Sequence, residues 1–185
     1  MVSIYIYMQS NRLILQRYVP LADIGVFSIA DTFASILLLI INALNSAYSP
    51  VFLKSAEDGR TRAQDETRSF IKIWWVVIMG IFLGYLVLSG YIIKLMTRPA
   101  FYPSIPLIPI LAFAYVFRGL YCFSANSIFY TEKTRLIPVI TVIAALVNVV
   151  CNIIFIPKFG IFAAAWVTVV SYFVNKNDVN LIHLQ

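Results

Sequence analysis

Charged side chains are scarce in this sequence. Only 12% of its 185 residues are Asp, Glu, Lys or Arg, whereas 61% are hydrophobic and the mean hydropathy is +0.87. A typical soluble domain is about 25% charged and roughly 45–50% apolar. A soluble fold of this length would have to leave much of its apolar surface in water. The scarcity of charge therefore excludes an ordinary soluble protein and predicts that lipid is the solvent.

Cysteine and histidine are nearly absent as well. Cys122 and Cys151 both lie inside apolar runs, and two cysteines are too few for a disulfide framework. The single histidine, His183, lies near the C-terminus. The sequence shows no paired metal ligands, no Gly-rich phosphate loop and no acidic pair at a membrane surface. We therefore expect no metal, no cofactor and no enzymatic activity.

The net charge of +6 sits in short breaks between apolar runs and not on a basic stripe interleaved with aromatic residues. This pattern fits the positive-inside bias of membrane proteins better than a nucleic-acid surface. One side of the expected membrane collects eight basic residues and the other five. The first side includes Lys54, Arg60, Arg62, Arg68 and Lys72. We therefore expect residues 54–72 in the cytoplasm and no nucleic-acid partner.

Long apolar runs are what the sequence has instead. A spanning helix needs about 20 mostly apolar residues, and the runs do not alternate polar with apolar as barrel strands do. We expect an all-α integral membrane bundle of about five full transmembrane helices plus a partial N-terminal one. The expected elements are a partial helix at 1–16, spans at 24–49, 70–93, 104–130, 136–156 and 161–174, a cytoplasmic loop at 54–69, and a polar tail at 175–185.

Ionisable residues inside the expected spans are the first candidates for function, because charge is costly at membrane depth. Arg118 lies in the middle of its span and is either the wall of an anion-attracting cavity or a structural charge paired to another helix. Asp31 lies about two turns into the first clear span. It either pairs with a basic residue such as Arg118, binds a cation or proton, or is a wet residue near the interface.

Asparagine pairs form a second group of candidates. Asn42 and Asn45 are three residues apart, and Asn148 and Asn152 are four apart, so each pair shares a helical face. Amide hydrogen bonds between membrane helices are worth roughly 0.6–2 kcal/mol. The pairs therefore serve either as hydrogen-bonding contacts between helices or as cavity lining.

Two stretches carry a resemblance to a known family. Residues 11–54 contain Asn11-Arg12, then Gly25-Val26-Phe27-Ser28, then Pro50. Residues 146–173 couple seven elements at fixed spacing, namely Asn148, Asn152, Ile156-Pro157, Phe159-Gly160, Ala164-Ala165, Thr168 and Ser171-Tyr172. This pattern resembles the second half of bacterial polysaccharide flippases, in the multidrug/oligosaccharidyl-lipid/polysaccharide superfamily. The sequence departs from it at Asn11, where the family usually has Asp, and at Ala163, where it usually has Gly.

The resemblance implies a function and a mechanism. Two helix bundles would rock about a central cavity, flipping an undecaprenyl-pyrophosphate-linked oligosaccharide across the cytoplasmic membrane for O-antigen, capsule or exopolysaccharide synthesis. Arg118, Arg12 and Arg17 would meet the pyrophosphate, with Asp31, Asn42 and Asn45 as further cavity residues. The chain would be a multi-pass inner-membrane protein corresponding to one half of the transporter. Its partners would be the lipid bilayer and either a missing N-terminal half or a second copy.

Two alternatives remain open. The first is a multidrug or lipid II exporter of the same superfamily, which would need cavity acids for cation coupling, and only Asp31 qualifies. The second is an inactive remnant or a membrane subunit that acts by association. The polar tail, residues 175–185, has no family resemblance and is interpreted as a possible non-native remnant.

Overall fold

The computed structural model describes residues 11–58, 60–130 and 136–183, and within these ranges it contains helices and short connections but no strand. A helical segment at residues 11–18 leads into α2 (Leu21–Asp58) and α3 (Arg60–Met96). The short 3-10 helix η1 (Pro99–Ser104), α4 (Leu107–Tyr130) and α5 (Leu136–His183) follow. The predicted all-α membrane fold is confirmed.

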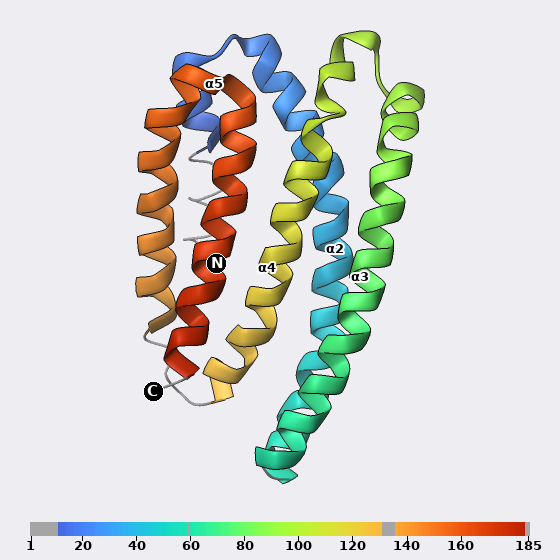
Figure 1. Cartoon of the computed structure of the whole chain (residues 1–185), viewed down its shortest axis with the longest axis vertical. Coiled ribbons are helices and arrows are strands. Elements are labelled where there is room, and N and C mark those ends of the chain that lie inside the picture. Colours follow the sequence, from blue (N-terminus) through green and yellow to red (C-terminus); the bar gives the residue numbers. More distant parts are fainter. Residues whose placement is uncertain (1–10, 59, 131–135, 184–185) are drawn as a thin grey trace.

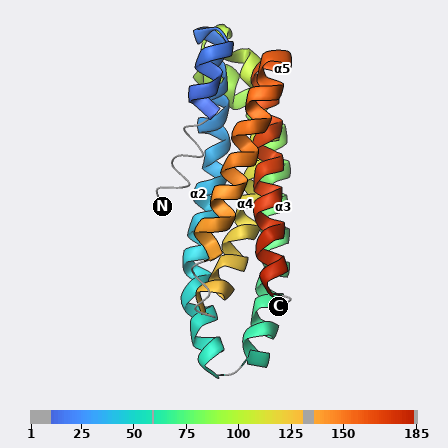
Figure 2. The same ribbon diagram turned by 90° about the vertical axis from the view of Figure 1, so that its left-hand side faces the viewer.

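The helices run side by side as an antiparallel bundle (Figures 1 and 2). α4 lies in the middle and packs against both α2 and α5, while α3 packs mainly against α2. α2 and α5 make few direct contacts with each other. The relative position of α2 and α5 therefore depends on α4.

Gly160 turns α5 back on itself. Its backbone has φ 59° and ψ −139°, which no α-helix contains, and Pro157 lies one turn before it and lacks an N–H donor. Figure 1 shows the result, two antiparallel legs that meet at one end of the bundle. We call residues 136–159 the first leg and residues 161–183 the second leg of α5.

Three stretches are long and apolar enough to cross a membrane within the described part of the chain, namely Leu21–Val51, Lys72–Met96 and Ala145–Phe173. The third includes the reversal at Gly160 and so belongs to both legs of α5. α4 contributes the shorter apolar stretch Leu107–Gly119. Large apolar side chains such as Leu39, Val76 and Trp166 are exposed on the outside, as expected where lipid surrounds the bundle.

Two expected boundaries differ in the structure. Residues 54–69, expected as a loop, are helical wherever they are described, because α2 runs to Asp58 and α3 begins at Arg60. Charge alone does not interrupt a helix, since Lys, Arg, Glu and Gln are good helix formers. Residues 175–183 of the expected polar tail likewise continue α5, which ends at His183. The spans 24–49 and 70–93 are therefore the apolar parts of longer helices.

Tight packing in one half of the bundle depends on Gly119 of α4. A Cβ atom at this position would lie 2.6 Å from Cζ2 of Trp74 and 2.9 Å from Cγ2 of Ile41. Trp74 and Ile41 are fully buried, on α3 and α2 respectively. The missing side chain of Gly119 therefore allows three helices to meet at this point.

We expect Gly119→Ala to destabilise the protein by about 1–3 kcal/mol, because the added methyl group overpacks a dense core. Gly80→Ala is the matched control, since a Cβ atom there meets nothing within 4 Å. The control should be neutral or stabilising by up to about 1 kcal/mol, because Ala favours a helix more than Gly. Unfolding of the purified protein in detergent measures both values, and equal stabilities would contradict the packing.

Gly160→Ala tests the hairpin in a different way. A Cβ atom there also meets nothing within 4 Å, so any loss of stability comes from the backbone alone. The backbone angles of Gly160 are costly for other residues, and we expect a loss of about 1–3 kcal/mol in unfolding free energy. An unchanged unfolding midpoint would show that the turn adopts other angles.

Candidate functional site

Polar side chains gather at one depth of the bundle. Asp31 is ten residues into α2, Tyr115 is eight residues into α4, and Thr168 is eight residues past the turn at Gly160. These helix ends lie together at the upper end of Figure 1. At 1.5 Å per residue, the three side chains lie about 12–15 Å below that end, inside the apolar stretches Leu21–Val51, Leu107–Gly119 and Ala145–Phe173.

We call this set the polar layer. Its members are Asn11, Arg12, Asp31, Tyr115, Arg118, Asn148, Asn152, Thr168, Ser171 and Tyr172. They come from the helical segment 11–18, α2, α4 and both legs of α5. Polar groups at this depth are costly in lipid unless they pair with one another or meet water.

Asp31 is the centre of the charged part of the layer. Its Oδ1 atom accepts a hydrogen bond of 2.6 Å from the Tyr115 hydroxyl, and its Oδ2 atom lies 3.9 Å from Nη2 of Arg12. The Asp31 side chain is 25% exposed and that of Arg12 is 43% exposed. The carboxylate is therefore bound to α4 by a short hydrogen bond and faces a more exposed cation on the segment 11–18.

Arg118 contacts a different helix from the one suggested by the sequence. Its Nη1 atom donates to the Tyr172 hydroxyl at 3.4 Å, and its guanidinium carbon lies 5.7 Å from the centre of the Tyr172 ring. Asp31 forms its ion pair with Arg12. The suggested pairing of Asp31 with Arg118 is therefore not found. Instead, Tyr115 of α4 contacts Asp31 on α2, and Arg118 of α4 contacts Tyr172 on α5.

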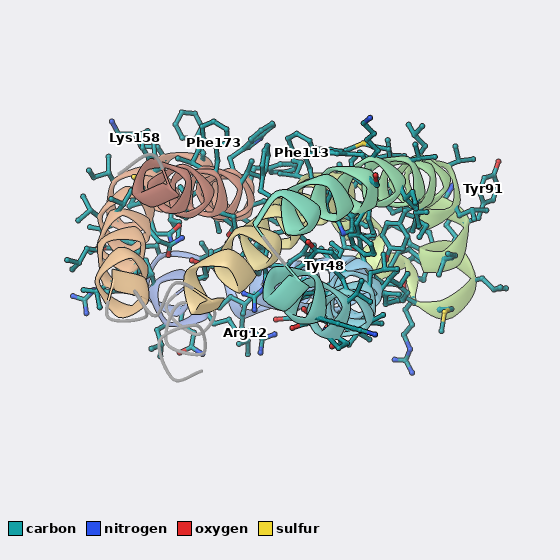
Figure 3. The ribbon with its side chains drawn as sticks, turned by 90° about the horizontal axis from the view of Figure 1, so that it is seen from below. Arg12, Tyr48, Tyr91, Phe113, Lys158 and Phe173 are labelled. Carbon is teal, nitrogen blue, oxygen red and sulfur yellow. The ribbon has the colours of Figure 1, made fainter. Side chains whose placement is uncertain are left out.

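A small pocket lies between these groups. Its lining residues are Asn11, Arg12, Phe27, Asp31, Tyr115, Thr168 and Tyr172, and its volume is about 20 Å³. A cavity of roughly 10–15 Å³ by this measure holds one water molecule. Figure 3, a view from below, shows Arg12 at one face of the bundle and Phe113 and Phe173 at the opposite face. Arg12 therefore lies on the face of the bundle opposite to the one that carries Phe113 and Phe173.

A network of neutral side chains completes the layer. Asn152 donates through Nδ2 to Oδ1 of Asn11 at 2.6 Å and to Oδ1 of Asn148 at 2.9 Å. Asn11 donates to Thr168 at 2.9 Å, and Asn148 donates to Ser171 at 3.1 Å. The predicted hydrogen-bonding role of Asn148 and Asn152 is confirmed. This amide network holds the segment 11–18 against both legs of α5.

Three of the candidate residues lie elsewhere. Arg17 is exposed near the end of the segment 11–18 and does not line the pocket. Asn42 is exposed and Asn45 half-buried, more than ten residues beyond Asp31 on α2. The structure therefore brings together Arg12, Asp31 and Arg118 from the expected set, and leaves Arg17, Asn42 and Asn45 outside the polar layer.

Sequence reasoning missed two tyrosines of the site. Tyr115 and Tyr172 connect Asp31 and Arg118 to their surroundings, and both are buried. Their spacing to Arg118 gave one usable signal, because Tyr115 precedes Arg118 by three residues and so shares its helical face. Among the described residues, no cluster of three His, Cys, Asp or Glu side chains is placed to hold a metal ion.

Asn152→Ala tests the amide network. The change removes two hydrogen-bond donors and leaves the oxygens of Asn11 and Asn148 buried without them. We expect a loss of about 1–3 kcal/mol in unfolding free energy. Ile153→Ala is the control, because the neighbouring side chain is about half exposed. A double-mutant cycle with Asn11→Ala should show coupling of about 0.6–2 kcal/mol, and strictly additive losses would contradict the contact.

Comparison with known proteins assigns the family. The MatE family profile matches residues 1–154, which is most of the chain. No curated protein and no solved structure matches the chain. Families of this kind move solutes across membranes and carry no enzymatic activity, which agrees with an all-helical bundle that contains a polar layer. The chain belongs to the MatE family of membrane transporters, in the multidrug/oligosaccharidyl-lipid/polysaccharide superfamily.

Proposed function

We propose that this chain forms a helical bundle of a flippase that carries a polyprenyl-pyrophosphate-linked oligosaccharide across the cytoplasmic membrane for polysaccharide synthesis. The observation that supports this substrate class is the charge of the polar layer. Two arginines, Arg12 and Arg118, lie in this layer with one carboxylate, Asp31. A layer with this excess of positive charge favours an anionic head group.

The free-energy cost of placing arginines in a membrane also supports an anionic substrate. An arginine at the centre of a membrane helix costs about 2.5–3.5 kcal/mol on insertion scales. Among the described residues, Asp31 faces Arg12 at 3.9 Å, while Arg118 contacts the hydroxyl and the ring of Tyr172. Guanidinium groups bind phosphate through paired N–H donors. A pyrophosphate passing through the site would give both arginines a function that offsets their cost.

A cation exporter is the main alternative. A cationic drug would need a free carboxylate at this depth, and Asp31 is the carboxylate present in the layer. However, Asp31 already accepts from Tyr115 and faces Arg12. A cationic substrate would have to displace a guanidinium from its carboxylate and then remain beside two positive charges. Lipid II carries a pyrophosphate too, so a lipid II exporter would share the chemistry of the proposed site.

The exposure of Arg12 also points to a second bundle. Its side chain is 43% exposed at a depth where lipid would surround an uncovered face. Charges at this depth face a bundle interior or a water-filled cavity. A second helical bundle, either a second copy of this chain or an N-terminal half, would cover this face and enclose the cavity. Alternating access would then open the cavity to one side of the membrane at a time.

Reconstitution in liposomes tests the proposal. We expect the chain to move a fluorescent polyprenyl-pyrophosphate oligosaccharide to the side where a quencher can reach it. Arg12→Gln and Arg118→Gln should each lower the rate by roughly tenfold or more, because hydrogen bonds to charged groups are worth about 1.5–3 kcal/mol. Lys158→Gln is the control, since it removes one exposed positive charge near the turn of α5, away from the pocket.

Two results would contradict the proposal. Rates equal to those of empty liposomes would reject transport of this lipid by this chain, either alone or as a pair of copies. Rates that are unchanged in both arginine variants would reject the role of the polar layer. Export of an organic cation such as ethidium, with loss in Asp31→Asn, would favour the multidrug alternative instead.

A further inference from the structure

The ion pair in the pocket is asymmetric. Asp31 is bound by the Tyr115 hydroxyl at 2.6 Å. Arg12 approaches Asp31 only at 3.9 Å, which is beyond hydrogen-bond distance. The guanidinium carries five N–H donors in a rigid fork, and its contact with Asp31 involves only Nη2. Arg12 is therefore the more easily displaced partner, and Asp31 is the more firmly placed one.

The pocket also has an entry for a competing anion. Arg12 and Asp31 both line it together with the hydroxyl-bearing residues Tyr115, Thr168 and Tyr172. The Arg12 side chain is nearly half exposed. A tetrahedral anion at this face would meet the open side of the guanidinium before it met any other described group of the pocket.

We propose that Asp31 competes internally with the anionic ligand for Arg12, so that a phosphate-type anion binds by taking Arg12 from Asp31, and Asp31 takes up a proton in exchange. The inference deepens the proposed function and rests on it for the identity of the anion. The only covalent bonds that change are O–H bonds, because a hydronium ion of the solvent loses the proton that the Asp31 carboxylate gains. One proton moves from water to the Asp31 carboxylate as the anion arrives.

Electrostatics around Asp31 explains why a proton would follow the anion. The groups facing it are Arg12 from the segment 11–18 and Tyr115 from α4, and Tyr172 from the second leg of α5 lines the same pocket. Arg118 of α4 contacts Tyr172 and not Asp31. On the α3 side, Tyr85 donates to the Phe33 carbonyl, two residues beyond Asp31. Once Arg12 binds the anion, two negative charges lie side by side. Like charges at short range favour protonation of one of them.

Thermodynamic linkage gives the sign of the effect. If anion binding takes up a proton, then protons must strengthen anion binding to the same extent. The affinity for the anion therefore rises as the pH falls through the range in which Asp31 titrates. The slope of log Kd against pH approaches one proton per anion bound. Without a carboxylate at position 31 the slope should vanish.

Inorganic sulfate is a suitable probe, because it remains doubly charged between about pH 5 and 8. The whole chain would be placed in nanodiscs of phosphatidylcholine, and sulfate affinity would be measured from its thermal stabilisation of the protein. We expect sulfate to bind wild type more tightly at pH 5 than at pH 8, by up to tenfold per pH unit. Asp31→Asn should bind as tightly at pH 8 as wild type does at pH 5, with no pH dependence.

Two further variants separate charge from structure. Arg12→Gln should weaken sulfate binding at every pH, whereas Arg12→Lys should bind more weakly than wild type and keep the pH dependence. Lys158→Gln should behave as wild type. An Asp31→Asn protein that retains the wild-type pH dependence, or that loses sulfate binding, would overturn the proposal. So would a wild-type affinity that does not change with pH, a result that needs no variant to fold.

These outcomes are independent of transport. A protein that shows the Asp31-dependent pH profile but flips no oligosaccharide lipid upholds the competition and rejects the proposed substrate. A protein that flips the lipid while its sulfate affinity is independent of pH rejects the competition alone.

Discussion

Lipid cannot hydrogen-bond to protein, and the rest of this structure depends on that constraint. Backbone groups in the hydrocarbon core must be satisfied within their own segment, so the spans are helices. Polar side chains in the hydrocarbon core likewise need hydrogen-bond partners within the protein. Asn11 of the segment 11–18 binds Asn152 of the first leg of α5, Asn148 of that leg binds Ser171 of the second leg, and Tyr85 donates to a carbonyl of α2. The polar contacts therefore fix which helices are neighbours, while apolar packing fills the space between them.

The sequence predicted the helices better than their ends. Apolar runs such as 24–49 and 70–93 identify spans, because lipid tolerates few charges there. Their helices continue to Asp58 and from Arg60, since water permits a helix of charged residues as readily as a loop. The break near Gly160 agrees with the separate spans expected at 136–156 and 161–174. Its geometry, with a positive φ at Gly160, could not be obtained from hydropathy.

The site was only partly predictable for a related reason. A charged side chain inside an apolar span is energetically costly, and this cost identifies Asp31 and Arg118 as candidates from the sequence alone. Which groups they contact depends on how the helices turn about their axes and which lie side by side. Arg12 reaches Asp31 because the segment 11–18 folds back along the bundle before α2 begins. Tyr115 had only its spacing to Arg118 as a signal, and Tyr172 only its place in the family-like run of residues 146–173. Neither signal identifies the side chain that the tyrosine contacts.

α4 connects the two charged halves of the site. Tyr115 and Arg118 are three residues apart and share one face of this helix. Tyr115 binds Asp31 of α2, and Arg118 contacts Tyr172 of α5, while α2 and α5 make few direct contacts. A shift of α5 relative to α2 must therefore change at least one of these two contacts on α4. One turn of α4 therefore contacts both the carboxylate that faces Arg12 and the second leg of the α5 hairpin.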